Sequence, residues 1–440
     1  MIDTEALRKK VLNTAFNGEL TTSLHMHKEW TWVPLEKIAT IYNGRAYKQT
    51  ELLTKKKGNT PVLRVGNLFT NNDWYYSDLE LDDNKYCDNG DLIYAWSASF
   101  GPFIWNGGKV IYHYHIWKIE HDDSIDRRFL YYFLMADTQA LKESAHGVAM
   151  VHITKARMEN TLVPVPTIAE QEEIVNIIDA FFSELQHIDD LQQQYANNIS
   201  SLNKKILDLA VRGKLVPQDP NDEPASVLLK KIAEEKQKLI KEGKIKKQKA
   251  LPAITEDAIP YDIPESWEWV RMDSICAKIT SGSTPAGGSK SNAYVEEGFP
   301  LFREQNVYND GIRKKGMVYI TEALLNTRAN STVVANDILL NITGGSIGRC
   351  ALVPSDFDRG SINQHILIIR NVNPALKEYI HMCICSPYFQ QQIMGNVVGD
   401  KDGFSAGRCK NVLVPVPPIP EQKRIVHSVN LMLEQIASLN

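Results

Sequence analysis

The sequence lacks the features that would place this chain in a membrane or an oxidising compartment. No run of about 18 apolar residues occurs among its 440 residues, so we expect no membrane span. The first residues lack the basic flank and apolar segment of a signal peptide. The six cysteines are scattered, without paired CxxC motifs, and this indicates reduced thiols rather than disulfides or a zinc site. We therefore expect a cytoplasmic protein.

A surplus of basic residues is also missing. The formal net charge is -4 and the pI is about 6.3, whereas a domain that binds nucleic acid unaided is usually basic. The contents of 43% hydrophobic and 23% charged residues are those of an ordinary globular protein. A role on nucleic acid would therefore require other subunits to supply much of the phosphate contact.

Catalytic motifs are absent as well. A methyltransferase needs a glycine-rich cofactor loop and an Asn- or Asp-Pro-Pro-aromatic tetrad, and neither is found. The glycine-rich segment 282–290 lacks the Gly-Lys-Ser/Thr ending of a phosphate loop. His113 and His115 alternate with aromatic residues on a predicted strand, where packing explains them better than metal binding. We expect no enzyme activity from this chain by itself, while a nuclease carboxylate cluster stays open as an alternative.

The sequence does contain an internal repeat. The segment TLVPVPTIAEQ at 161–171 returns as VLVPVPPIPEQ at 412–422. Trp-x-Trp-Val occurs at 30–33 and again at 267–270. The pattern L-x-K-K-(V/I)-L…A…G-x-L of residues 202–215 is also found near the N-terminus. The chain is therefore two copies of one unit in a circularly shifted order.

A heptad pattern of apolar residues accompanies the repeat. It predicts a helix from Glu170 to Arg212 that ends at Gly213 and is about 60 Å long. The same pattern restarts at 425–439, and residues 1–18 resemble the distal part of that helix. We expect the two chain ends to meet and form a split second helix against the continuous one, with a gap of about 9 Å. The alternative is a pair of unrelated short helices.

Two mixed segments between the helical parts share their landmarks. Each continues from Trp-x-Trp-Val through a glycine turn, at Gly44 or Gly282, to a Pro-x-x-Arg-x-x-Asn stretch. Each closes with a predicted helix, at 128–143 or 374–394, and a Leu-Val-Pro-Val-Pro strand. The predicted parts are the distal half of the second helix (1–25), a first globular domain (26–167), the central helix (168–213), a linker with a charged helix (214–262), a second globular domain (263–418) and the proximal half of the second helix (419–440).

The linker is predicted to contain a charged helix at 225–242, followed by a basic tract at 244–249. For this tract a solvated linker is favoured over a DNA contact.

Polar side chains near the glycine turns and in the Arg/Asn stretches suit DNA recognition. Arginine offers a fork that matches guanine or a phosphate, and asparagine matches adenine. The alternative is that the Arg/Asn pairs fix a turn with a salt bridge and that each lysine is a solvated surface charge. The candidate DNA-binding residues are Arg45, Tyr47, Lys48, Arg64 and Asn67 in the first domain, and Ser281, Ser283, Thr284, Lys290, Arg303 and Asn306 in the second.

With these motifs the chain resembles the specificity (S) subunit of type I restriction-modification systems. The resemblance covers nearly all of the chain and is carried by the junctions 165–171 and 416–422, and by 207–216 with its diverged copy 12–20. It implies an α/β (α+β) fold, in which a long antiparallel coiled-coil helix pair separates two β-rich target-recognition domains related by a pseudo-twofold repeat. One departure is that the distal half of the second helical region stands at the N-terminus.

The resemblance also implies a function. Each domain would read one half of a bipartite, asymmetric DNA site, and the helix pair would set the spacer between the halves. The implied partners are double-stranded DNA, two modification (M) subunits and restriction (R) subunits, with no membrane. No cofactor is expected on this chain, because S-adenosylmethionine, ATP and Mg would serve the partners that methylate adenine and cleave DNA. A self-contained nuclease or methyltransferase and a coiled-coil scaffold without a DNA role stay open as alternatives.

Overall fold

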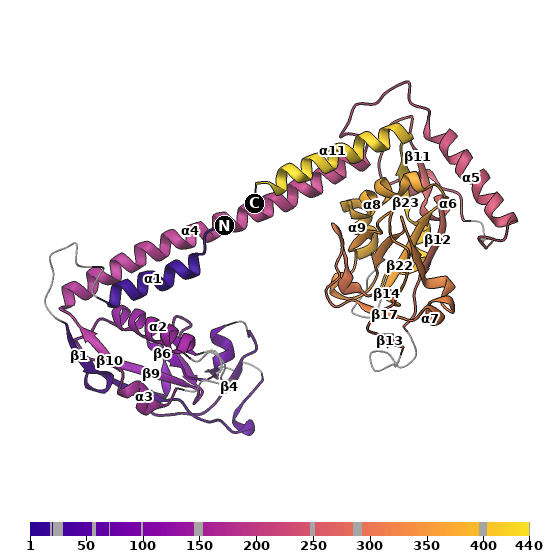
Figure 1. The fold of residues 1–440 in the computed structure, drawn as a ribbon. Helices are drawn as coiled ribbons and strands as arrows, with labels where there is room; N and C mark the ends of the chain where they lie inside the picture. Colours follow the sequence, from indigo (N-terminus) through magenta and orange to yellow (C-terminus); the bar gives the residue numbers. More distant parts are fainter. Residues whose placement is uncertain are drawn as a thin grey trace. The chain divides into compact units, whose positions relative to one another are not determined.

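A computed structural model gives the fold (Figure 1). It describes residues 1–17, 20, 30–54, 59–69, 71–97, 100–144, 153–246, 251–284, 293–395 and 403–439. The chain forms two compact units, unit 1 (Met1–Gln194) and unit 2 (Tyr195–Asn440). None of the helices in these described ranges is long and apolar enough to cross a membrane.

The longest element is the helix α4 (Ile168–Val211), with 44 residues. The prediction of a helix from Glu170 to Arg212 is confirmed to within two residues at each end. The helix stops where predicted, because Gly213 has a φ of +67° and the Lys214 N–H donates to the Leu209 carbonyl. The part of α4 up to Gln194 belongs to unit 1 and the remainder to unit 2.

Unit 1 contains two four-stranded sheets, which pack around a mixed core with the helix α2 (Arg127–Ser144). The first sheet has the order β2 (Ala39–Asn43), β9 (Ile116–His121), β6 (Leu92–Ala95), β7 (Gly101–Ile104). The second has the order β4 (Tyr75–Ser77), β3 (Thr60–Leu63), β8 (Val110–Tyr112), β5 (Tyr86–Cys87). An antiparallel clasp joins the beginning of the domain, β1 (Thr31–Pro34), to its end, β10 (Leu162–Val165).

Unit 2 repeats this order strand by strand. Its first sheet is β12 (Cys276–Ser281), β22 (Ile366–Asn371), β19 (Ile338–Asn341), β20 (Cys350–Leu352). Its second sheet is β13 (Tyr294–Val295), β17 (Val318–Ile320), β14 (Phe299–Phe302), β21 (Arg359–Ile362), β18 (Thr332–Val334), and β13 has no counterpart in unit 1. The clasp is β11 (Glu268–Arg271) with β23 (Leu413–Val416), and a further hairpin is β15 (Val307–Tyr308) with β16 (Gly311–Ile312). The internal repeat of the sequence is therefore a repeat of the fold.

The helices after the sheets differ between the units. The prediction of one helix at 374–394 is wrong, because α8 (Lys377–Cys385) ends and α9 (Pro387–Met394) begins around Ser386. Proline cannot donate a backbone hydrogen bond inside a helix, and the Ser386 side chain caps the new one. The other short helices are α3 (Lys155–Glu159), α6 (Met272–Ile275), α7 (Glu322–Asn326) and α10 (Ala406–Asn411).

The predicted charged helix of the linker is confirmed as α5 (Ala225–Lys241). Its buried residues Ala225, Leu228 and Ile232 pack on the core of unit 2. Residues 247–249 of the basic tract lie outside the described residues. All six cysteines are free thiols, as predicted.

Each unit contains an antiparallel pair of helices. In unit 1, the Thr4 hydroxyl and the Arg8 guanidinium of α1 (Thr4–Phe16) bind Asp189, at 2.5 and 2.8 Å. Phe16, at the other end of α1, shares a core with Ile174.

In unit 2, Ile425 of α11 (Ile419–Ala437) shares a core with Ala210 of α4. At the other end of this pair, the Tyr195 hydroxyl donates to the Leu439 carbonyl at 3.1 Å. That the two ends of the chain meet stays a prediction.

The repeated Trp and Glu-Gln motifs form one device that fastens a helix to a domain. The indole N–H of Trp30 donates to Glu170 at 3.0 Å, and that of Trp267 donates to Glu421 at 2.9 Å. The next residue, a buried glutamine, donates its amide to the proline carbonyl five positions before it in both copies. The sequence repeats these residues because both junctions require the same hydrogen bonds.

Candidate functional site

A short turn stands at the same place in both units, between the last strand of a parallel pair and the next strand of the other sheet. In unit 1 it comprises residues 113–115, and the His113 N–H donates to the Leu63 carbonyl at 2.9 Å. In unit 2 it comprises residues 363–365, and the Asn363 N–H donates to the Phe302 carbonyl at 3.1 Å. Each turn therefore lies beside the residue that follows β3 or β14, which is Arg64 or Arg303.

The glycine turns are required by the close approach of these backbones. A Cβ atom on Gly44 would lie 2.2 Å from the His113 carbonyl oxygen, and one on Gly282 would lie 2.2 Å from that of Ile362. Since any larger residue would collide with backbone here, glycine allows the segments after it to reach the turns. These segments contain most of the other candidate residues.

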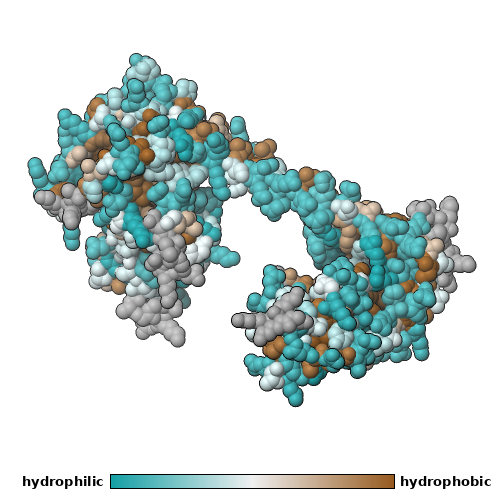
Figure 2. All heavy atoms as spheres, turned by 180° about the vertical axis from the view of Figure 1, so that it is seen from behind, coloured by the Kyte–Doolittle hydropathy of each residue, from teal (hydrophilic) through white to brown (hydrophobic). Residues whose placement is uncertain are grey.

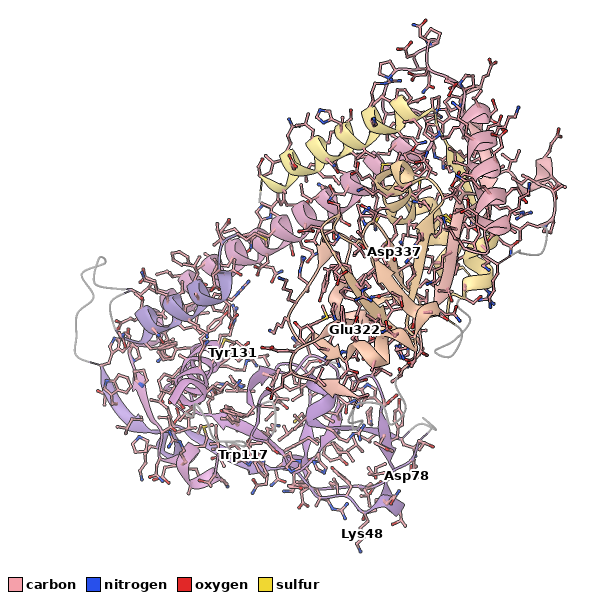
Figure 3. All side chains as sticks on the ribbon, turned by 45° about the vertical axis from the view of Figure 1, so that its right-hand side comes forward. Lys48, Asp78, Trp117, Tyr131, Glu322 and Asp337 are labelled. Carbon is pink, nitrogen blue, oxygen red and sulfur yellow. The ribbon has the colours of Figure 1, made fainter. Side chains whose placement is uncertain are left out.

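In unit 1 the segment after Gly44 packs against the 113–115 turn. Arg45 pairs with Glu51 at 2.9 Å and lies 5.6 Å from the ring centre of Tyr47. The Tyr47 ring stacks on His113 with centroids 6.4 Å apart, and its hydroxyl donates to the Tyr112 carbonyl at 3.2 Å. Burial raises the pKa of Tyr47 well above its ordinary value, so its hydroxyl stays protonated. Lys48 is exposed and points away from the unit (Figure 3).

The paired asparagines hold the same loop in both units. The Oδ1 atom of Asn67 accepts from the Arg64 N–H at 3.2 Å, and that of Asn306 accepts from the Arg303 N–H at 3.0 Å. Both Nδ2 groups donate to two backbone carbonyls of the following loop. These contacts assign the asparagine amides a role in shaping the loop, and a contact to adenine stays a prediction.

The paired arginines are held by the same loops rather than by a salt bridge. A terminal nitrogen of Arg64 donates to the Asp73 carbonyl at 2.9 Å, and its guanidinium lies 4.3 Å from the ring centre of Tyr75. The corresponding nitrogen of Arg303 donates to the Gly316 carbonyl. The Nε atom of each arginine is buried and has no hydrogen-bond partner among the described residues. Both guanidinium groups are thus fixed in place with donor capacity left over.

The 113–115 turn carries an aromatic cluster. Tyr114 lies between His113 and His115 at centroid distances of 4.4 and 3.9 Å, and Trp96 packs 5.0 Å from His115. Burial, with the nearby charges of His115 and Arg64, lowers the pKa of His113 to about 4, so this imidazole is neutral at pH 7. The prediction that both histidines lie on a strand is wrong, because the chain turns between β8 and β9. Their alternation with aromatic residues imitated a strand pattern.

The 363–365 turn carries amides instead. Asn363 donates to the Glu304 carboxylate at 3.0 Å. The Nδ1 atom of His365 lies 2.6 Å from the Thr343 hydroxyl, and its Nε2 atom lies 2.8 Å from the Gln364 amide nitrogen. Burial opposes ionisation of Glu304, but the hydrogen bond from Asn363 and the charges nearby hold the pKa of this carboxyl below its ordinary value. The turn therefore has an anionic support behind an exposed glutamine.

The remaining candidates of unit 2 are distributed around this turn. The Thr284 hydroxyl donates to the Gln364 side-chain oxygen, and Ser283 offers its carbonyl to Arg328. Ser281 is exposed on β12, opposite Leu367. Lys290 lies outside the described residues.

Two features of unit 2 were not identified from the sequence. Arg328 is buried and fastens the Ser283 segment to β21 through Ser361 and the Ile362 carbonyl, both at 3.0 Å. No local pattern signals this role, because its partners are remote in the sequence. The exposed basic run 313–315 (Arg-Lys-Lys) forms the loop that Asn306 binds, and the run itself was the available signal.

These turns offer hydrogen-bonding and aromatic groups rather than a metal site. In the described parts of both units, no group of three or more His, Cys, Asp or Glu residues is arranged to hold a metal ion. Polar side chains predominate on the face seen in Figure 2, where apolar residues form scattered patches.

Comparison with known proteins gives consistent similarities. A family model described as the type I restriction modification DNA specificity domain matches residues 27–194 and 264–437. The chain is 30% identical to the EcoAI specificity subunit of Escherichia coli over 272 residues, which are 61% of this chain and 45% of that subunit. It is 23% identical to the EcoBI specificity subunit of Escherichia coli over 446 residues, which are 98% of this chain and 84% of that subunit.

One solved structure has a similar fold. It comes from work on the complex assembly and conformational transition of the type I R-M system, with a TM-score of 0.58 and 15% identity. The similarity covers 93% of this chain and 91% of that chain.

Proposed function

Because the chain belongs to the family of type I restriction-modification DNA specificity subunits, we propose that it selects the DNA site of such a system without catalysing a reaction itself. The observation that carries the proposal is the pair of equivalent turns. The strand order around them is the same in both units, whereas their side chains are His-Tyr-His in one and Asn-Gln-His in the other. A constant scaffold with divergent loops suits two modules that recognise different ligands. The two units would therefore read two different half-sites of a bipartite, asymmetric sequence.

The residues proposed to contact DNA lie around these turns. Arg45 and Arg64 in unit 1, and Arg303 with Thr284 in unit 2, have side chains that suit base edges or phosphates. Asn67 and Asn306 would act by positioning the arginines. The proposed set is completed by Tyr47, Lys48, Ser281, Ser283 and Lys290.

The helix α4 and its partner helices would act as the ruler between the half-sites. A helix of 44 residues is about 66 Å long at a rise of about 1.5 Å per residue. The partners of the proposal are double-stranded DNA, two M subunits that use S-adenosylmethionine to methylate adenine, and R subunits that use ATP and Mg. The net charge of -4 fits a chain whose partners neutralise much of the DNA phosphate charge.

The decisive experiment is methylome sequencing of a host that carries the M subunits, with and without this chain. The expected result is a two-part methylated motif that appears only when the chain is present. No new motif in a host with active M subunits would contradict the proposal.

A binding titration tests the alternative of a self-contained enzyme. Clear binding of S-adenosylmethionine by the purified chain would favour a methyltransferase. Selection of a bipartite sequence by the chain with its M partner would reject the scaffold alternative.

A further inference from the structure

Tyr114 and Gln364 occupy the same position in the two units, in the middle of the equivalent turns. Tyr114 is 39% exposed and Gln364 is also exposed, while the residues that follow each turn, Ile116 and Ile366, are buried. The hydrogen bonds that place the turns come from backbone groups and are the same in both units. The middle side chain is therefore free to vary without disturbing the sheets beneath it.

The side chain of Gln364 is held in one orientation by its neighbours. Its oxygen accepts from the Thr284 hydroxyl, and its nitrogen lies 2.8 Å from Nε2 of His365. Since this nitrogen donates, Nε2 accepts, and the proton of His365 lies on Nδ1, facing the Thr343 hydroxyl at 2.6 Å. The amide is thus oriented before any ligand arrives.

These contacts leave half of the amide's hydrogen-bonding capacity unused. A glutamine amide has two N–H donors and an oxygen with two acceptor positions. His365 takes one donor and Thr284 takes one acceptor position. One donor and one acceptor remain, and this is the pair that matches N7 and the N6 amino group of adenine in the major groove.

The surroundings of Gln364 suit a DNA backbone on either side of a base. Arg303 adjoins the turn through its neighbour Glu304, which binds Asn363. The loop that binds Arg303 contains the exposed run of Arg313, Lys314 and Lys315. Basic side chains next to a fixed polar group are the arrangement in which phosphates set the register and one side chain reads the base.

Unit 1 offers a different chemistry at the same position. Tyr114 is enclosed by two imidazoles and presents an aromatic surface, and the loop at 71–73 (Asn-Asn-Asp) lacks the basic run of unit 2. An apolar or aromatic side chain suits the methyl group of thymine rather than the edge of adenine.

We infer that Gln364 determines the specificity of unit 2 for one adenine of its half-site, and that Tyr114 is the corresponding residue of unit 1. This inference rests on the proposed function and adds to it the residue and the base.

The test uses the full chain together with the M subunits of its system. Gln364→Ala removes the amide, and Gln364→Glu keeps its shape but replaces the donor with an acceptor, which suits the amino group of cytosine. Gln391→Ala, at an exposed glutamine of α9, is the matched control. Each variant is measured by methylome sequencing and by binding to duplexes in which every position of the site is changed in turn.

We expect Gln364→Ala to make one adenine position of one half-site degenerate, with a loss of discrimination of about 5- to 150-fold. The Glu variant should shift that position toward cytosine, and the control should leave the motif unchanged. Tyr114→Ala should change the other half-site only.

The possible failures are distinguishable. An unchanged motif with Gln364→Ala overturns the inference while the proposed function stands. An equal loss of affinity for all duplexes also overturns it, because Gln364 would then act on the DNA backbone or the fold. If Gln364→Ala fails to fold, the isosteric Glu variant decides. Absence of any two-part motif with the unaltered chain contradicts the proposed function itself.

Discussion

Replacing Glu421 with alanine should loosen the attachment of α11 to the domain of unit 2. Glu421 is 1% exposed and accepts from the indole of Trp267, which is 3% exposed, and from the Gln218 amide. Alanine would leave the Trp267 N–H buried without an acceptor. A lost hydrogen bond to a carboxylate, with an unsatisfied buried donor, costs about 2–3 kcal/mol of unfolding free energy.

Comparison of the two copies refines this magnitude. Trp30, the counterpart of Trp267, is only half-buried, so its N–H can turn to water when Glu170 is replaced. We therefore expect Glu170→Ala to cost about 1 kcal/mol, less than Glu421→Ala. In a unit of this size, about 1 kcal/mol corresponds to a shift in Tm of roughly 2–4 °C. Glu421→Ala should lower the Tm of the transition of unit 2 by about 4–12 °C.

The pH dependence supplies an independent measurement at the same residue. Burial raises the pKa of Glu421, against the opposing effect of the hydrogen bonds from Trp267 and Gln218. A carboxyl with a raised pKa in the folded state keeps its stabilising proton below the unfolded pKa of about 4.3 and loses that stability as pH rises through the folded pKa. Glu421→Gln cannot ionise, so its stability relative to the unaltered chain should increase between about pH 4 and pH 7.

Calorimetric and chemical unfolding of the chain and its three variants would measure both effects. Glu421→Gln keeps an acceptor for Trp267 and serves as the control for Glu421→Ala. The reasoning is refuted if Glu421→Ala unfolds within about 0.5 kcal/mol of the unaltered chain, the range of an ordinary surface substitution. It is also refuted if Glu170→Ala proves the more damaging of the two.

Three further changes test other parts of the molecule. Arg64→Ala should relax or abolish recognition of one half-site only; equal weakening of both halves, with a smaller salt dependence of binding, would make Arg64 a phosphate contact instead. Insertion of four residues near Gln192 should lengthen the helix by about 6 Å and change the preferred spacer by one or two base pairs, whereas an unchanged spacer in methylome sequencing would mean that the helix does not set it. Gly282→Ala should cost about 1–3 kcal/mol in thermal unfolding and impair one half-site, because its Cβ would collide with the Ile362 carbonyl. Gly345→Ala, whose Cβ would meet nothing within 4 Å, is the matched control, and equal behaviour of the two glycine variants would show that the close approach does not matter.

The sequence was sufficient for the features that depend on local periodicity or on repetition. The heptad seam predicted α4 to within two residues, and the paired motifs predicted that the two units share one fold. It failed where a local pattern had two structural interpretations. His113 and His115 alternate as a strand would, and their turn becomes evident only when β8 pairs in parallel with β3.

The composition of the candidate site was partly predictable for the same reason. Arg64 and Arg303 were identified by their repeated spacing, and the structure places each beside an equivalent turn. Gln364 and Arg328 were missed because their partners come from strands remote in the sequence. The break at Ser386 was written in the sequence as Ser-Pro, although the apolar pattern on either side continued through it.

The clasps of the two domains have a consequence for how specificity can change. The strands that enter and leave each domain, β1 with β10 and β11 with β23, are direct neighbours joined by backbone hydrogen bonds. A whole domain can therefore be exchanged through two adjacent joints, without altering the helices on which it sits. Recombination at the near-identical Leu-Val-Pro-Val-Pro segments 162–166 and 413–417 would transplant an intact reader and give the chain a new target in a single genetic event.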